Sequence, residues 1–286
     1  MARNLMLCLA FFLSGVVLIG CPSSNSVTGD AEMKLSLEQV VPREFDYHTI
    51  INAEALRSNK ELRQQYPEIN NISRLLDCDD DISTMWFTGE TGMTQLIEGS
   101  FEQSTVMESL VSGYDLRQSD YKGFTVWVWK DLQIWLFIKD NMLIFGYNEE
   151  VKRCLDVIQS QQGSLLQDDA FVTVSNQLPS NAVYYQFARG RFLNWWDYEG
   201  LEYGGYCIEF DNTSVVTLTS VCQFADSISA EAAMEEMSAE MADYLNFDWR
   251  DVEALREGKL VKVSAQFSDP ELLLAKLFDV TDSSFQ

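Results

Sequence analysis

The residue types that most often carry acid–base and nucleophilic chemistry are scarce in this chain. The single histidine, His48, lies in an alternating stretch that predicts a strand, and we expect an ordinary structural role for it. One histidine cannot build a catalytic histidine triad or a multi-histidine metal site. The sequence also lacks a G-x-S-x-G elbow, a phosphate-binding glycine loop and a dinucleotide-binding fingerprint.

Carboxylates are plentiful, and one cluster has the composition of a cation site. Asp77, Asp79, Asp80 and Asp81 lie in one short stretch, and calcium takes several carboxylate oxygens from a single loop. The stretch does not have the spacing of an EF-hand loop, so we favour the interpretation that it is an acidic helix end in solvent over a metal site. We predict no cofactor. A carboxylate pair for glycoside hydrolysis stays open, because the separation it needs is spatial.

The most suggestive candidate for a binding site is an aromatic stretch within residues 189–206. Aromatic faces beside acids and amides suit sugars, peptides or cationic ligands. The residues predicted to bind a ligand are Trp195, Trp196, Tyr198 and Tyr203. We expect at least one of the two tryptophans to be exposed as the wall of a groove. The alternative is a long loop that folds its own aromatic rings onto a sheet.

The N-terminal segment indicates where the protein resides. Arg3 is the only charged residue before Asp30, and an apolar run extends from Leu5 to Ile19, which is the layout of a signal peptide. This run is too short for a comfortable membrane-spanning helix. Such a leader can be removed by ordinary secretory cleavage, can stay as an uncleaved anchor, or can precede a lipidated cysteine.

The apolar run ends in Leu18-Ile19-Gly20-Cys21, which resembles the lipobox of bacterial lipoproteins. The resemblance implies that residues 1–20 are removed and that Cys21 carries several acyl chains. A single chain binds a membrane only marginally, so multiple acylation is what stable anchoring requires. We therefore expect a lipid-anchored protein on the extracytoplasmic side of the cell envelope.

Four cysteines then remain for the folded part, namely Cys78, Cys154, Cys207 and Cys222. An even number outside the cytoplasm permits two disulfides in three connectivities. Cys154 falls on the inward stripe of a predicted helix and Cys222 on an apolar strand face, so buried free thiols are slightly favoured. No pair has the C-x-x-C spacing of a metal site.

The composition describes a packed and strongly acidic domain. Hydrophobic residues make up 47% of the chain and aromatic residues 12%, which is enough for a large core. Asp and Glu total 44 against 20 Lys and Arg, giving a net charge of -24. Such a surface repels nucleic acid phosphates, so a nucleic-acid partner is excluded. The acids are scattered along the chain, which favours a role in solubility.

Three consecutive apolar stretches give the clearest structural signal. Gly123–Lys130, Gln133–Lys139 and Met142–Tyr147 predict strands joined by tight turns. A helix capped by Asn148 should follow, with two glutamates in its first turn. Further predicted elements are a strand at Val183–Ala188, a hairpin of Tyr206–Phe210 and Val215–Phe224, helices at Ala230–Leu245 and Asp248–Arg256, a strand at Leu260–Phe267 and a helix at Pro270–Phe278.

Similar strand-to-helix junctions recur near Ser100, Ser227 and Asp269, which indicates an internal duplication. The predicted fold class is α+β, in two related halves, each an antiparallel sheet backed by amphipathic helices. The predicted segments are a signal peptide (1–20), a lipidated cysteine and flexible tether (21–38), a first half (39–165) and a second half (166–286).

The chain also resembles an uncharacterised family of predicted bacterial envelope proteins, a domain of unknown function. The resemblance rests on Ile50–Arg57, Leu96–Gly99, Tyr121–Gly123 and Leu178–Ala182. It implies a fold and a location but no activity. We therefore expect a non-catalytic, lipid-anchored envelope protein that binds a ligand or partner protein or supports an assembly. The alternative is an envelope hydrolase whose carboxylates the sequence does not identify.

Overall fold

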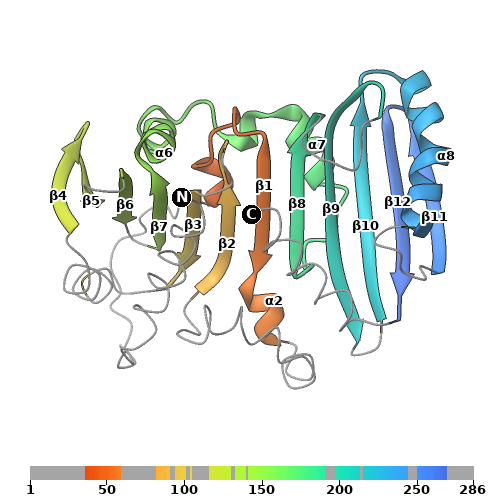
Figure 1. Ribbon diagram of the computed structural model, residues 1–286, viewed down its shortest axis with the longest axis horizontal. Coiled ribbons are helices and arrows are strands. Elements are labelled where there is room, and N and C mark those ends of the chain that lie inside the picture. Colours follow the sequence, from red (N-terminus) through yellow and green to blue (C-terminus); the bar gives the residue numbers. More distant parts are fainter. Residues whose placement is uncertain are drawn as a thin grey trace.

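A computed structural model describes residues 36–58, 82–90, 94–100, 104, 116–129, 133–139, 141–190, 198–212, 215–243 and 250–268. The described part is built around one antiparallel sheet (Figure 1). Its strands are β1 (Tyr47–Asn52), β2 (Ile82–Thr88), β3 (Thr94–Gly99), β4 (Leu116–Tyr121), β5 (Phe124–Trp129), β6 (Ile134–Lys139), β7 (Met142–Tyr147), β8 (Tyr184–Arg189), β9 (Leu201–Asn212), β10 (Val215–Phe224), β11 (Arg250–Glu257) and β12 (Leu260–Phe267).

The helices pack on both faces of this sheet. They are the 3₁₀ turns η1 (Leu37–Gln39) and η3 (Leu165–Gln167) and the α-helices α2 (Ala53–Ser58), α6 (Asn148–Ser160), α7 (Asp169–Ser175) and α8 (Ser227–Asp243). Within the described part of the chain, no helix combines the length and the apolar character needed to cross a membrane.

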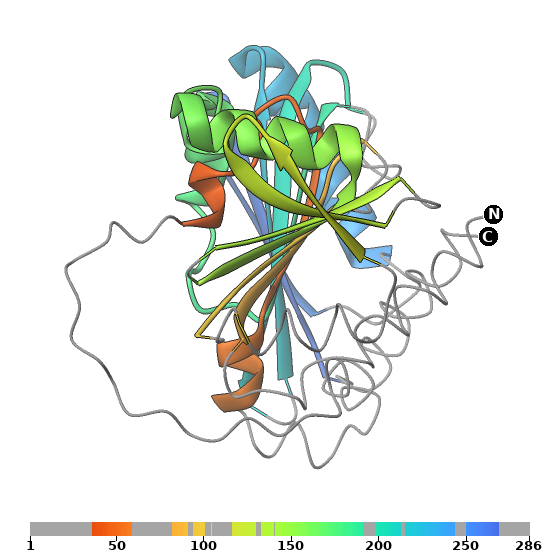
Figure 2. The ribbon, with the colours of Figure 1, turned by 90° about the vertical axis from the view of Figure 1, so that its left-hand side faces the viewer.

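The α+β class is confirmed, but the strands form one sheet and not a separate sheet in each half. The strand order is β11-β12-β10-β9-β8-β1-β2-β3-β7-β6-β5-β4, and the described strands number twelve. The two predicted halves join because β1 pairs with β8 over five residue pairs, from Tyr47↔Ala188 to Ile51↔Tyr184. Figure 2 shows the strong twist that a sheet of this width accumulates.

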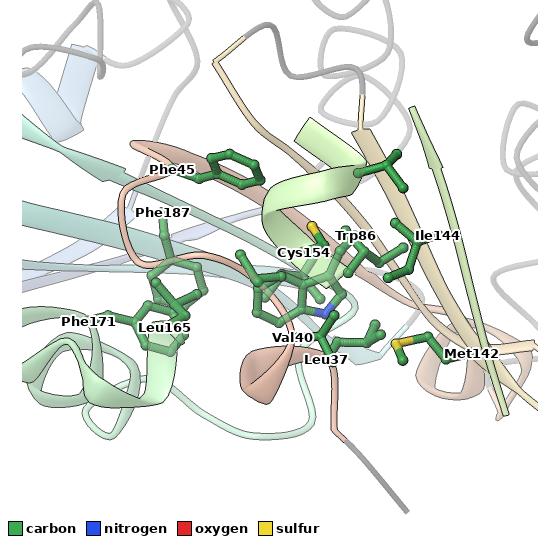
Figure 3. Close-up of a cluster of buried hydrophobic side chains, with 14 of the residues drawn as sticks. Leu37, Val40, Phe45, Trp86, Met142, Ile144, Cys154, Leu165, Phe171 and Phe187 are labelled. Atoms are coloured by element: carbon green, nitrogen blue, oxygen red, sulfur yellow. The ribbon is translucent and has the colours of Figure 1, made fainter. Parts of the chain in front are cut away.

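Each face of the sheet carries its own core. The first, called here the α6–α7 face, packs Trp86 and Phe187 of the sheet against Cys154 of α6 and Phe171 of α7 (Figure 3). The second, called the α8 face, packs strands β10 and β12 against the apolar side of α8, including Met237. Strands with large apolar residues on both sides, as the sequence shows, are expected in a sheet covered on both faces.

Several predicted elements are wrong in detail. A helix is predicted at Asp248–Arg256, but its described part, from Arg250 onwards, belongs to strand β11 in the structure, because this segment pairs with β12. The polar strand β4 is not apparent from the sequence, and β9 begins at Leu201, five residues before the strand predicted at Tyr206–Phe210. Asn148 is the first residue of α6, whose N-cap is Tyr147.

Candidate binding site and buried polar clusters

The predicted aromatic site does not form one groove in the described part of the chain. Tyr198 lies on the α8 face, where its ring packs near Phe224 and its hydroxyl donates to Glu240 of α8. Tyr203 lies on the α6–α7 face and is fully buried. These two tyrosines therefore belong to opposite cores and do not line one groove together. Trp195 and Trp196 lie outside the described residues.

The other predicted sites are also outside the described residues. They are the lipidation site Cys21 and the weak cation candidate Asp77, Asp79 and Asp81. Among the residues that the structure describes, no group of three or more His, Cys, Asp or Glu side chains is placed to hold a metal ion.

Arg189, the last residue of β8, organises a charged cluster at the end of the α6–α7 face. Its guanidinium donates to Asp168, lies 3.6 Å from Asp46 Oδ1 and sits 5.4 Å from the centre of the Tyr203 ring. Asp168 also caps α7, since its Oδ1 accepts from the backbone N–H of Ala170 at 3.0 Å. The cluster therefore ties α7 to the sheet where the candidate aromatic loop begins.

The Tyr203 hydroxyl is a buried polar group with no hydrogen-bond partner among the described residues. Burial raises its pKa, and the nearby carboxylates of Asp168 and Asp46 add to that effect while Arg189 opposes it. Tyr203 is thus a protonated phenol at neutral pH.

His48 has a fixed role in the same core. Its Nδ1 lies 2.7 Å from Thr88 Oγ1, within hydrogen-bond distance, and Thr88 Oγ1 also lies 3.1 Å from the Tyr47 carbonyl oxygen. Nε2 has no partner among the described residues. Burial lowers the His48 pKa to about 3; the Phe45 carbonyl opposes this shift and the charge of Arg189 adds to it. A fully buried, neutral imidazole fits the predicted structural role.

The polar row continues across the sheet from His48. Thr88 pairs with His48 on one side and with Thr94 on the other, and the Thr94 hydroxyl donates to Glu150 in the first turn of α6. Glu150 is nearly buried, and a Cβ on Gly89 would lie 2.7 Å from its Cδ. Gly89, with φ +103°, is therefore needed for both its backbone conformation and the room it leaves.

A second polar cluster lies on the α8 face, around the side-chain amide of Gln186. Gln186 Oε1 accepts from Tyr184 at 3.2 Å and from Tyr206 at 2.5 Å, while Gln186 Nε2 donates to the Tyr47 hydroxyl at 2.8 Å. Thr49 also donates to Tyr47, at 2.9 Å. These bonds connect β1 with β8 and β9. The cluster, called here the central tyrosine network, therefore links the N-terminal strands to the C-terminal ones.

The described cysteines are buried free thiols, as the sequence slightly favours. Cys154, Cys207 and Cys222 are unpaired and buried, while Cys78 lies outside the described residues. Burial raises the pKa of Cys154, and raises the pKa values of Cys207 and Cys222 to about 12. A thiol is a poor nucleophile until it ionises, so these groups are chemically quiet at neutral pH.

The polar clusters depend on contacts that sequence patterns do not reveal. Arg189 and Asp168 are 21 positions apart, and His48 meets Thr88 across 40 positions. The available signals were the arginine at a strand end and the aspartate before a short helix. Neither signal indicates that the two side chains meet.

Comparison with known proteins finds similar chains, but it assigns no activity to this one. No family model matches the chain. The chain is 22% identical over 246 residues to the uncharacterized protein MJ0635 of Methanocaldococcus jannaschii, covering 82% of this chain and 83% of the relative. No catalytic family is indicated by this match.

Among solved structures, the chain is similar to TP0453 in crystal form IV, with a TM-score of 0.52 and 10% identity. That match covers 87% of this chain and 99% of the other. Crystal form III of the same protein matches with a TM-score of 0.47 and 9% identity, over 85% and 98% of the two chains. The likeness at this level of identity is one of fold.

Proposed function

We propose that this protein is a lipid-anchored, extracytoplasmic envelope protein of non-catalytic type, which binds a ligand or partner protein or supports an envelope assembly. The leader and the Leu18–Cys21 sequence support the location. The proposal that the protein is not an enzyme rests on one observation. The buried polar groups of the described core serve mainly to hold its helices and strands together.

Each titratable group of that core has a structural partner or is sealed from solvent. Asp168 caps α7 and binds Arg189, Glu150 accepts from Thr94, and His48 is fully buried beside Thr88. A catalytic acid or base must reach the proton that it moves in a bound substrate. This use of the carboxylates favours a binding or supporting role over the alternative of an envelope hydrolase.

We further propose that the chain consists of two related halves, fused through the sheet. The order β1-β2-β3-β7-β6 in the first half matches β8-β9-β10-β12-β11 in the second, each being a three-strand meander followed by a returning hairpin. Tyr47 and Tyr184 start the matching strands β1 and β8, and both bond to Gln186. An experimental structure in which these strand sets fail to superpose would contradict the duplication.

Membrane fractionation tests the anchoring. Cys21→Ser should release the protein from the membrane fraction or leave an unprocessed precursor, because the acyl-accepting thiol is lost. Cys8→Ser, which changes a cysteine inside the leader, is the matched control and should fractionate like the wild-type protein. Unchanged fractionation and unchanged processing of Cys21→Ser would overturn the proposal.

A second measurement separates a binding protein from a hydrolase. The wild-type protein, purified from membranes after mild cross-linking, should retain a specific partner or ligand that an unrelated lipoprotein of similar charge does not. Incubation of the purified protein with envelope glycans or peptides should release no new reducing ends or amino groups. Release of such groups at a rate proportional to protein concentration would favour the hydrolase.

A further inference from the structure

The two edges of the sheet, β4 and β11, differ in regularity. β4 pairs with β5 through six consecutive residue pairs without interruption. β11 pairs with β12 with a register shift between Arg250 and Glu253, and Asp251 within it has a φ of +49°. A bulge of this kind twists an edge away from a flat pairing partner, which protects it from strand addition. Among the described strands, β4 is thus the edge with the more regular backbone.

The β4 edge is also held in place. The turn residues Lys122 and Gly123 both have positive φ values, +51° and +87°, as a two-residue hairpin turn requires. The Tyr121 hydroxyl lies 3.2 Å from Asp156 of α6, and Lys122 Nζ lies 2.7 Å from the same carboxylate. The Tyr121 ring packs edge-on against Trp135, with 5.6 Å between centroids. The strand is therefore pre-organised as an extended edge.

The hairpin turn decides which backbone groups of β4 face outwards. In a two-residue hairpin the residues that flank the turn form a hydrogen-bonded pair, here Tyr121 and Phe124. The N–H and C=O groups alternate along a strand, so those of Gln118 and Asp120 point away from β5. The side chains from Arg117 to Asp120 are exposed. This edge therefore offers a template for another strand.

We propose that a second copy of this chain pairs with β4, edge to edge and antiparallel, about a two-fold axis. The two-fold axis passes through a residue that faces itself in the second copy, and we consider Gln118 or Ser119 for this position. Residues equally far before and after that central residue then lie opposite each other. The charged residues of β4 are Arg117 and Asp120, and neither register places like charges opposite. In the Ser119 register, Asp120 faces Gln118 of the second copy, whose amide can donate to its carboxylate.

Charge selects this edge for self-association. The chain carries a net charge of -24, so two copies repel each other over most of their surface. β4 carries one positive and one negative side chain and is neutral, and the charge of Lys122 in the adjoining turn is balanced by Asp156, whose Oδ1 lies 2.7 Å from Lys122 Nζ. Two β4 strands can therefore meet without the repulsion that other acidic surfaces would bring.

The difference between the edges also limits the assembly to two copies. Pairing of β4 with β11 of another copy would be head-to-tail and would extend into a filament. The bulge at Asp251 and the charges of β11 oppose that contact. Pairing of β4 with β4 uses the same surface on both copies and closes after two.

Light scattering and sedimentation of the full-length protein in mild detergent test the pairing. The wild-type protein should be a concentration-dependent dimer. Gln118→Pro removes an outward N–H while leaving the β4–β5 ladder intact, and should weaken the dimer by about ten-fold or more. The matched control is Ala254→Pro, which removes an N–H that by the same rule points outwards from β11, and it should leave the dimer unchanged.

Single-cysteine cross-linking keeps the test independent of the proline variants. In a Cys78→Ser background, Gln118→Cys or Ser119→Cys should form a cross-linked dimer, since one of them faces itself across the axis. Ala254→Cys should remain uncross-linked. A protein that is monomeric at all concentrations, or a dimer that survives Gln118→Pro without cross-linking at either position, would overturn the proposal.

Discussion

The two faces of the sheet use their buried polar groups in different ways. On the α6–α7 face, the row of His48, Thr88, Thr94 and Glu150 is enclosed, and His48 Nε2 lacks a partner in the described part of the chain. On the α8 face, Tyr47, Tyr184 and Tyr206 each bond to the side-chain amide of Gln186.

Solvent access distinguishes these two arrangements. Thr88 and His48 have no exposed surface, whereas in the central tyrosine network Tyr206 is buried but Tyr47, Tyr184 and Gln186 are only half-buried. A water molecule can replace a lost hydrogen bond in a half-buried network but not in a sealed row. We therefore expect substitutions in the row to cost more stability than substitutions in the central tyrosine network.

The largest effect should come from Gly89→Ala, beside the sealed row. The substitution forces a side chain onto a residue with φ +103° and places its Cβ against the Glu150 carboxylate. Backbone strain and overpacking together should lower the free energy of unfolding by about 3 kcal/mol. The control is Gly123→Ala, where φ is +87° and nothing lies within 4 Å of the new Cβ. Equal losses in urea denaturation would show that the row is not tightly enclosed.

A smaller effect should follow from pH, through His48. The pKa is about 3 in the folded protein against 6.5 for an ordinary histidine, so between these values the unfolded state binds a proton that the folded state does not. Stability should therefore fall as the pH drops below 6.5, by about 2 kcal/mol at pH 5.

The contribution of His48 is isolated by comparing the wild-type protein with His48→Asn. Urea denaturation from pH 8 to pH 5 should show a shallower pH dependence in the variant, whatever its absolute stability. Parallel pH profiles for the two proteins would mean that His48 is not held neutral in the core.

The smallest effect should come from the central tyrosine network. Tyr206→Phe removes a hydroxyl that bonds to Gln186 at 2.5 Å from a buried ring, and should cost about 1 kcal/mol. Tyr184→Phe removes a longer bond from a half-buried ring and should cost less. If either tyrosine variant lost more free energy of unfolding than Gly89→Ala, the α8 face would be the more sensitive of the two, contrary to this account.

Periodic sequence signals predicted the interior of the fold well. The meander of β5, β6 and β7, the helix α8 with its buried Met237, and the free thiol of Cys154 all agree with the structure. These features depend on local spacing of apolar residues, which the sequence displays directly.

The edges of the sheet were not predictable in the same way. Arg250–Glu257 contains Ala, Leu, Glu and Arg, which favour helices, and it becomes a strand because β12 is available beside it. Leu116–Tyr121 is polar and exposed, so it lacks an apolar alternation that would indicate a strand. Tertiary pairing decides both segments.

The candidate site shows the same limit. The sequence singled out Tyr198 and Tyr203 for their chemistry, but five positions of separation do not indicate which face each will meet. A turn between them and the start of β9 send the two rings to opposite cores. The contact of Arg189 with Asp168 depends on how α7 docks on the sheet, which no local pattern encodes.

The central claim is that this domain is held at a membrane through Cys21, and intact-mass spectrometry of the protein extracted from membranes tests it most directly. We expect a chain that begins at Cys21, lacks residues 1–20 and carries the added mass of acyl chains. An unmodified chain that retains residues 1–20, or one cleaved elsewhere without added acyl mass, would contradict the claim.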